Sequence, residues 1–130
     1  MNTSQTEKEI QDFFDEFIQA YPKDDLQRYL DLFHQDENLI MFGTGEKWIG
    51  WEEYKNAPAE DRSRYDRISL SYDWLKINSY DIVAWIAAGV NVEIHTGERK
   101  MNFPGRLTGV LKKINGKWKI VQGHVSIPPT

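Results

Sequence analysis

Hydrophobic residues recur every three or four positions near the start of the chain, with polar residues between them. The apolar positions of this segment are Ile10, Phe13, Phe14, Phe17, Ile18 and Tyr21. The spacing predicts an amphipathic helix with one buried face. Ser4 or Thr6 can cap its start, since each precedes a glutamate by three residues, and Pro22 ends it.

Shorter elements are predicted before the second half of the chain. A second helix begins at Asp24 or Asp25. Its buried positions are Leu26, Tyr29, Leu30 and Phe33. A short apolar strand over 39–42 and a brief helix stopped by Pro58 follow. Charged residues of both signs crowd into 59–67, which is typical of an exposed loop without a chemical role.

In the second half of the chain, apolar and polar residues alternate, which predicts long antiparallel strands. The first strand begins at residue 68 and turns at Asn78-Ser79 into a strand over 82–94. A turn over 95–98 leads into a third strand over 99–113.

The last two strands are joined at Asn115-Gly116, a dipeptide that tolerates positive φ. A two-residue turn there pairs Lys113 with Trp118, whereas a three-residue loop over 114–116 pairs Lys112 with Trp118. We favour the three-residue loop, because it gathers the polar residues of the hairpin on one face. The polar pairs in that register are Thr108 with Gln122 and Arg106 with His124.

The two faces of this hairpin differ in polarity. The apolar face carries Leu107, Leu111, Val121 and Val125. Buried polar groups cost free energy unless they are paired, so four of them on one face favour a lined cavity beneath the helices. The alternatives are that these residues hydrogen-bond to one another or face solvent. If helices cover the polar face, only a partner can cover the apolar face, which Ile86 and Val90 extend, and this predicts a homodimer.

Composition narrows the class of protein. A chain of 130 residues is expected to form one domain over 1–130. The net charge of -4, without a basic stripe, argues against nucleic-acid binding. The absence of cysteine, the spacing of the histidines and the lack of a phosphate-binding glycine loop predict neither a metal nor a cofactor. No apolar stretch is long enough for a membrane span or a signal peptide, so we expect a cytoplasmic protein without membrane contact.

His124 is the best candidate for a general acid or base, because its reference pKa lies near neutrality. A histidine that is hydrogen-bonded within the fold is an equal alternative. Arg106 is placed to hold a carboxylate or an enolate oxygen, or to form a structural ion pair with Glu93 or with an acid on a helix. The residues expected to bind a ligand beside them are Thr108, Gln122, Trp85, Trp48, Tyr54, Asn91 and Ser126.

Several short motifs occur in a characteristic order. They are Asp25-Leu26, Leu32-Phe33, Trp48-Ile49-Gly50, Arg106-x-Thr108, Asn115-Gly116-x-Trp118-x-Ile120 and His124-x-Ser126. With the order of helices and strands, which covers nearly the whole chain, they resemble the NTF2-like superfamily and, within it, the SnoaL-like group. The resemblance implies an α+β fold: a cone-shaped barrel in which N-terminal helices pack on a curved, mostly antiparallel sheet around a deep pocket. It also implies a dimer formed through the outer face of the sheet.

The superfamily includes isomerases, dehydratases, epoxide hydrolases, ligand carriers and assembly domains, so the resemblance does not fix an activity. The tyrosine acid and aspartate base of the ketosteroid-isomerase type fall here on Phe17 and Phe42, which cannot move a proton. The scytalone-dehydratase type needs two histidines and a carboxylate, and only His124 is expected in the pocket. Two functions stay open: a pocket protein, enzyme or carrier, for an apolar oxygen-bearing compound, and a non-catalytic dimeric assembly or partner-binding domain.

Overall fold

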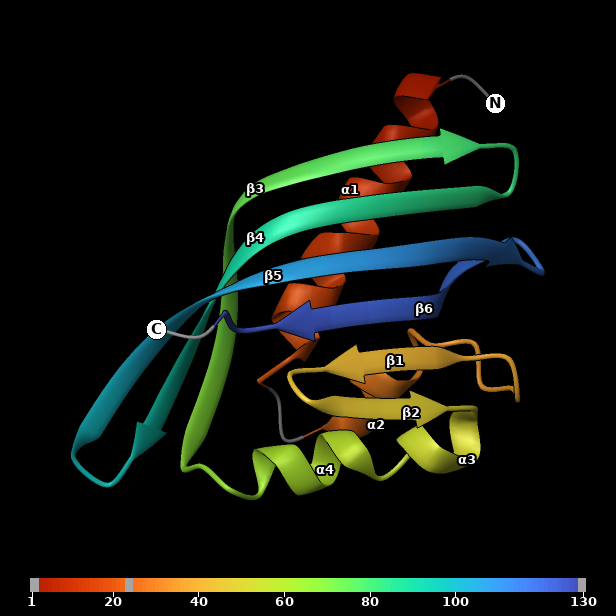
Figure 1. Ribbon diagram of the computed structural model, residues 1–130. Coiled ribbons are helices and arrows are strands. Elements are labelled where there is room, and N and C mark those ends of the chain that lie inside the picture. Colours follow the sequence, from red (N-terminus) through yellow and green to blue (C-terminus); the bar gives the residue numbers. More distant parts are fainter. Residues whose placement is uncertain (1–2, 23–24, 129–130) are drawn as a thin grey trace.

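The computed structural model describes residues 3–22 and 25–128, with side chains from Gln5 onward. The helices are α1 (Thr3–Ala20), α2 (Leu26–Leu30), α3 (Trp51–Tyr54) and α4 (Ala57–Arg62). The strands are β1 (Ile40–Gly43), β2 (Glu46–Ile49), β3 (Arg67–Tyr80), β4 (Val83–Thr96), β5 (Arg99–Ile114) and β6 (Lys117–Ser126). Figure 1 shows α1 behind the long strands and the shorter helices gathered near β1 and β2. The expected α+β fold, with N-terminal helices on a curved and mostly antiparallel sheet, is confirmed.

The six strands form one sheet in the order β2-β1-β6-β5-β4-β3. All neighbours are antiparallel except β1 and β6, which run parallel. The sheet is open and does not close into the cone-shaped barrel that we expected, because β2 and β3 lie at its two edges and do not pair with each other. The start of β3 and the hairpin between β4 and β5 bend toward α4, so the sheet curves around the short helices (Figure 1).

Helix α1 packs its predicted apolar stripe against one face of the sheet, which we call the inner face. Phe14 is only 1% exposed, and its ring meets Tyr72 of β3 edge-on at a centroid distance of 5.0 Å. Polar contacts fix the position of the helix along the sheet. The Glu9 carboxylate accepts a hydrogen bond of 2.8 Å from the Trp118 indole and one of 3.3 Å from the Lys113 ammonium.

The turn between β5 and β6 differs from the one that we favoured. Asn115 and Gly116 have φ values of 52° and 80°, and Lys113 pairs with Trp118, so the loop has two residues rather than three. Two consecutive residues at positive φ are what a type I′ turn needs, and its twist matches that of the strands. The alternative register of the sequence analysis is therefore the correct one at the turn.

A β-bulge then changes the register within β6. Leu111 pairs with Ile120, whereas Val110 pairs with Gln122, so Val121 is the extra residue. Thr108 consequently lies opposite His124 and not opposite Gln122. Arg106 lies opposite Ser126 and not opposite His124, so the two predicted polar pairs are wrong. Alternation of residue types does not reveal a bulge, because the inserted valine suits either face.

The helices cover the apolar face of the hairpin, whereas we expected them to cover its polar face. Leu107 and Leu111 are buried with Phe14 of α1, and the partly buried Phe13 packs beside them. Thr108, Gln122 and His124 are exposed on the opposite face, which we call the outer face and which points toward the viewer in Figure 1. The amphipathic helix needs an apolar surface, and the sheet offers one only on this side. The prediction that these polar residues line a cavity beneath the helices is therefore wrong. No partner is needed to cover the apolar face, because the helices cover it.

Several local predictions also need adjustment. The turn between β3 and β4 lies at Asp81-Ile82, later than predicted, and Asp81 has a φ of 57°. Asp25 occupies the N-cap position of α2 but makes no side-chain capping bond. Thr6 is buried within α1 and is not its cap. The alternatives Ser4 and Asp24 fall outside the described side chains.

Within the described ranges, no helix has both the length and the apolar character that a membrane span requires. The cytoplasmic location stays a prediction.

Candidate ligand-binding site

A cavity of about 370 Å³ lies on the inner face, between the curved end of the sheet and the helices α2 to α4. This size falls within the range of about 300–1,000 Å³ that is typical of small-molecule pockets. Its apolar wall comes mainly from α1 and from strands of the sheet: Phe17, Met41, Ile68, Val92, Ile94 and Val125. Its polar groups come mainly from the short helices: Tyr29 of α2, Tyr54 of α3, and Asp61 and Arg62 of α4. We call this space the inner cavity.

Tyr29 and Tyr54 place a pair of hydroxyl groups in the inner cavity. The two residues are 3% and 6% exposed, and their hydroxyl oxygens lie 3.4 Å apart. Burial raises the pKa of both phenols, so both stay protonated near neutral pH. Only one of the two hydroxyl hydrogens can serve the bond between them. The other is a donor for which the structure provides no acceptor among the described residues.

Arg62 is fixed by the backbone at two of its three nitrogens. Its Nε donates a hydrogen bond of 2.7 Å to the carbonyl of Tyr21, just past the end of α1, and its Nη1 donates one of 3.1 Å to the carbonyl of Pro58. The guanidinium carbon also lies 4.5 Å from the ring centroid of Tyr21 and 4.4 Å from that of Tyr29. Both distances are within the range of cation–π attraction. The guanidinium is therefore held in one position at the cavity wall.

The third nitrogen of Arg62, Nη2, is buried and has no hydrogen-bond partner of normal geometry among the described residues, although the guanidinium lies close enough to the Tyr29 hydroxyl to oppose the rise in the pKa of that phenol. Fewer than about one buried backbone or side-chain polar group in ten is left unpaired in folded proteins, so such an atom calls for an explanation. Within residues 3–22 and 25–128, Arg62 also takes part in no ion pair. Hydrocarbon walls of the inner cavity thus lie beside buried hydrogen-bond donors that lack acceptors among the described residues.

Arg62 and Asp61 were not predicted as site residues, because we expected 59–67 to be an exposed loop and Pro58 to stop a helix. Pro58 instead lies in the first turn of α4, where its fixed φ suits a helix and its missing N–H costs nothing. The basic Arg62 in the last turn of α4 suits the helix dipole. A proline followed by Ala-Glu-Asp-Arg was the available signal for a helix that starts rather than ends here.

Two of the residues that we expected to bind a ligand, Trp48 and Tyr54, line the inner cavity. Their rings meet edge-on at a centroid distance of 5.4 Å. Tyr29 and Tyr21 were assigned only to the buried faces of helices. Helical periodicity does not distinguish a core tyrosine from one at a cavity wall.

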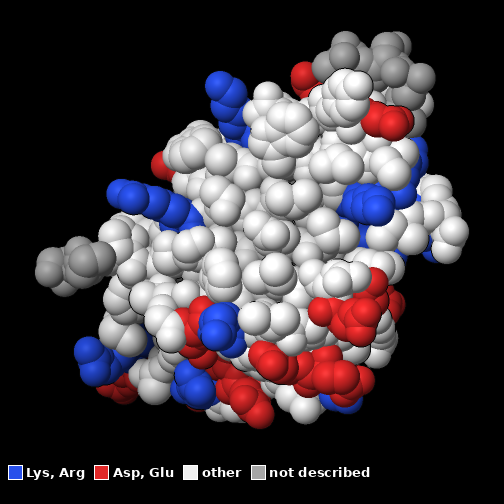
Figure 2. Space-filling model, turned by 45° about the vertical axis from the view of Figure 1, so that its right-hand side comes forward, with Lys and Arg blue, Asp and Glu red and all other residues white. Residues whose placement is uncertain are grey.

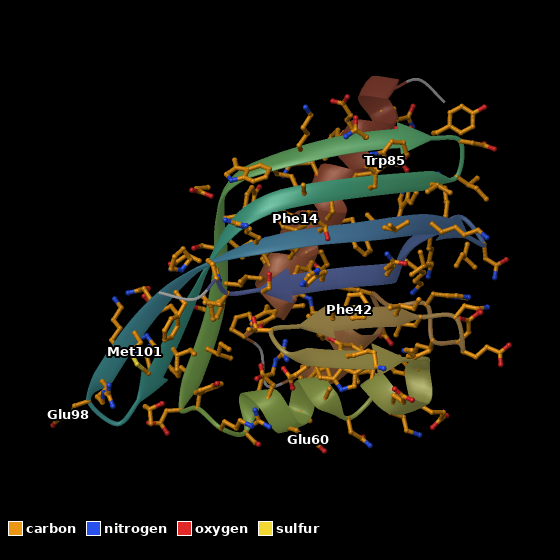
Figure 3. The ribbon with its side chains drawn as sticks, viewed as in Figure 1. Phe14, Phe42, Glu60, Trp85, Glu98 and Met101 are labelled. Atoms are coloured by element: carbon orange, nitrogen blue, oxygen red, sulfur yellow. The ribbon has the colours of Figure 1, made fainter. Side chains whose placement is uncertain are left out.

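Four other predicted residues come together on the outer face instead. Trp85, Thr108, Gln122 and His124 line a groove of about 350 Å³, with Phe42 beside them. The His124 ring meets Phe42 edge-on at a centroid distance of 5.7 Å. We call this space the outer groove. Figure 3 labels Phe42 and Trp85, which line the outer groove, and Phe14 of α1, which lies on the other side of the sheet.

The remaining predicted residues lie on the outer face but do not line the outer groove. Arg106 pairs with Ser126 across β5 and β6. The Asn91 side chain donates a hydrogen bond of 3.1 Å to the Asn102 side chain. Glu93, the alternative partner of Arg106, pairs instead with His95 at 3.0 Å and Lys100 at 3.2 Å.

The described residues contain no group of three or more histidine, aspartate or glutamate side chains placed to hold a metal ion. None of the three histidines lines the inner cavity in the described part of the chain. His34 lies 2.9 Å from Asp36, and His95 contacts Glu93. Proton transfer in the inner cavity would therefore fall to a carboxylate, and Asp61 is the least exposed one there.

This architecture and cavity agree with a match in sequence. The sequence model of the SnoaL-like domain matches residues 10–130. The chain belongs to the SnoaL-like domain family. No curated protein matches it in sequence.

Solved structures of the same fold are similar to this SnoaL-like domain over nearly its full length. An NTF2-like superfamily protein from Salmonella enterica serovar Typhimurium is 21% identical with a TM-score of 0.88, covering 99% of this chain and 95% of that one. A proposed dehydratase of the NTF2-like family from Streptomyces avermitilis is 14% identical with a TM-score of 0.87, covering 98% and 100%. A proposed calcium/calmodulin-dependent protein kinase II association domain from Xanthomonas campestris is 20% identical with a TM-score of 0.80, covering 93% and 86%. At these identities the likeness shows the shared fold alone.

Proposed function

We propose that this SnoaL-like domain binds a small, largely apolar molecule with an oxygen acceptor in its inner cavity. The observation that carries the proposal is the buried Nη2 atom of Arg62, which has no partner among the described residues. A buried donor without an acceptor costs about 1–3 kcal/mol, and a ligand oxygen beside it would remove that cost. The apolar wall formed by residues such as Phe17, Val92 and Val125 would hold the body of the ligand.

Binding without turnover is the activity that the geometry supports best. The inner cavity has no imidazole among the described residues, and burial raises the pKa of Tyr21, Tyr29 and Tyr54, which stay protonated near neutral pH. A dehydratase-like reaction, as the similarity to the Streptomyces protein suggests, would have to use Asp61 as its base. Asp61→Asn distinguishes a binding protein from an enzyme, because a binding protein keeps its ligand, whereas an enzyme loses turnover.

The experiment that tests the proposal blocks each concave site in turn. Ketones, aromatic polyketide-like compounds and short carboxylic acids are screened by thermal shift against the wild type. The hits are then measured on Val92→Phe, which narrows the inner cavity, and on Ala87→Phe, which narrows the outer groove from the same strand. We expect Val92→Phe to abolish the hits and Ala87→Phe to keep them.

Loss of the hits only in Ala87→Phe would overturn the proposal and move the site to the outer groove, where His124 and Gln122 lie. Tyr29→Phe serves as a second inner-cavity variant, because it removes one hydroxyl and adds no volume. It guards against the case in which Val92→Phe fails to fold, since its hits are then compared with those of Ala87→Phe.

We also propose a homodimer formed through the outer face. Trp74, Trp85 and Phe42 are 51%, 45% and 39% exposed on this side of the molecule. Figure 2 shows the surface over the sheet as mostly uncharged at its centre, with charged side chains gathered toward its edges. Large exposed apolar patches on soluble proteins commonly mark protein contacts. The similarity to the proposed association domain from Xanthomonas supports the same assignment.

Light scattering at micromolar concentration tests the dimer. We expect a mass of two chains for the wild type and of one chain for Trp85→Lys, which places a charge in the centre of the contact. A one-chain mass for the wild type would contradict the proposal.

A further inference from the structure

The positive charge of Arg62 is permanent, and the described residues do not neutralise it. An arginine side chain is not deprotonated in proteins. The groups near the guanidinium are two backbone carbonyls, the ring faces of Tyr21 and Tyr29, and the hydroxyl of Tyr29, whose pKa Arg62 lowers against the larger effect of burial. Dipoles and ring quadrupoles attract a cation, but they bring no negative charge. A ligand that carries a negative charge would complement the inner cavity better than a neutral one.

The number of free donors points in the same direction. Among the described residues, no acceptor of normal geometry faces the two hydrogens on Nη2 of Arg62, and the Tyr29–Tyr54 pair leaves one hydroxyl hydrogen over. A ketone oxygen accepts at most two of these hydrogens. A carboxylate has two oxygens with about four acceptor positions, and its planar shape matches a guanidinium.

Further negative charges on the ligand would be unfavourable, because three carboxylates also line the cavity. Asp61 is partly buried, whereas Glu46, Glu60 and the second cation of the wall, Arg64, are exposed. Asp61 acts on the site electrostatically, since after burial its negative charge is among the causes that raise the pKa of Tyr21 and of Tyr29. A dianion or a phosphate would meet this repulsion, whereas a single carboxylate directed at Arg62 would meet less of it.

We propose that the ligand of the inner cavity is a monocarboxylate with an apolar body, whose carboxylate binds to Arg62 and the Tyr29–Tyr54 hydroxyl pair. This inference rests on the proposed function, since it names the chemical class of the compound bound at the same site. The apolar body lies against Phe17, Val92 and Val125.

Calorimetric titration with matched probes tests the inference. The probes are 2-naphthoate and its methyl ketone, 2-acetylnaphthalene, followed by decanoate and 2-undecanone as an aliphatic pair. For the wild type we expect each carboxylate to bind at least about 10-fold more tightly than its ketone, because hydrogen bonds to charged groups are about twice as strong. Arg62→Gln should weaken carboxylate binding by about 10- to 100-fold and change ketone binding by less than about threefold.

Asp61→Asn is the complementary variant, because it leaves the Arg62 contacts with the backbone in place. Removal of the neighbouring negative charge should tighten carboxylate binding by about two- to fivefold without altering ketone binding. This variant keeps the inference testable if Arg62→Gln is unstable. Glu60→Gln is the exposed control, for which we expect less than a twofold change in carboxylate binding.

The possible results separate the two proposals. If neither member of either pair binds to the wild type, the proposed function and this inference fail together. If the ketones bind as tightly as the carboxylates and Val92→Phe abolishes both, the inner cavity is a ligand site but the carboxylate inference is wrong. Equal effects of Asp61→Asn on both probes would also overturn the inference.

Discussion

The inner and outer faces of one sheet carry hollows of similar size, about 370 and about 350 Å³, but their polar groups have different origins. In the outer groove, polar side chains such as Thr108 and Gln122 come from the strands and reach solvent. In the inner cavity, the strands supply hydrocarbon, and the polar groups come mainly from helices. A polar residue that reaches water needs no partner, whereas the enclosed Nη2 atom of Arg62 does. An unpaired buried donor is therefore a stronger sign of a ligand site than a row of polar strand residues.

The largest expected difference between the faces is in stability. Phe14 is 1% exposed on the inner side, and Trp85 is 45% exposed on the outer side. Phe14→Ala should lower the free energy of unfolding by about 3–5 kcal/mol, because it leaves a cavity in the core. Trp85→Ala should cost less than about 1 kcal/mol in the monomer. Urea denaturation of both variants measures the contrast, and equal losses would show that the outer face is buried in an assembly.

A smaller effect is expected for the two arginines that line the inner cavity. Arg62→Gln removes hydrogen bonds to the carbonyls of Tyr21 and Pro58, and should cost about 1–3 kcal/mol. Arg64→Gln is the matched control, because Arg64 is exposed, and we expect a change within about 0.5 kcal/mol. Thermal unfolding of both variants tests this. An Arg62 variant as stable as the Arg64 variant would show that the guanidinium does not fix α4 to α1.

The sequence predicted the faces of the elements better than their partners. The apolar stripe of α1 and the alternation along β4 were visible because each follows from one local period. The bulge at Val121 and the position of the β3–β4 turn were not, because they shift pairing without changing the pattern of residue types. Alternation shows that a strand has two faces, but only the packing of α1 decides which of them is covered.

The candidate site was predictable only in part for a related reason. Trp48 and Tyr54 were expected at a ligand site because aromatic side chains are common in pockets, and they line the inner cavity. Arg62 lies 41 residues from Tyr21, whose carbonyl it binds, and no local period links the two. His124 and Arg106 were assigned to a pocket from a register that the bulge removes. Their role in the outer groove or in a dimer stays a prediction.

The hydrogen bonds of Glu9, which hold α1 on the sheet, predict how stability depends on pH. The Trp118 indole hydrogen bond lowers the pKa of the Glu9 carboxyl below its ordinary value of 4.5, and Lys113 adds to this against the opposing effect of burial. A carboxyl whose pKa is lower in the folded state stabilises the fold above its unfolded pKa, and this contribution disappears as the pH falls through the folded pKa. Glu9→Gln should therefore flatten the loss of stability below about pH 4.5, as measured by urea denaturation between pH 3 and 6.

The corresponding carboxylate of the outer face is Glu93, and it provides the comparison for this titration. The hydrogen bond from His95, followed by that from Lys100, lowers the pKa of Glu93. Glu93→Gln should also flatten the loss of stability at acid pH, but without loosening α1. Tryptophan fluorescence distinguishes the two variants, because only Glu9→Gln removes a carboxylate that accepts a bond from an indole. If Glu9→Gln loses stability at acid pH as the wild type does, the contact between Glu9 and Trp118 does not contribute to folding.

The smallest expected effect concerns Gly89 on the outer face. A Cβ atom there would lie 2.2 Å from the Trp74 indole nitrogen and 2.7 Å from an Asp73 carboxylate oxygen, so Gly89→Ala requires both side chains to move. Trp74 is 51% exposed and can turn into solvent, so we expect a loss of less than about 1 kcal/mol in the monomer.

If the outer face forms a dimer, the displaced indole should disturb its contact. Light scattering of Gly89→Ala should then show a higher dimer dissociation constant than that of the wild type. Gly97→Ala is the control, because a Cβ at that turn would meet no described residue within 4 Å apart from its two chain neighbours, and any strain comes from its φ of 62°. A dimer weakened equally by both changes would show that Trp74 is not part of the contact.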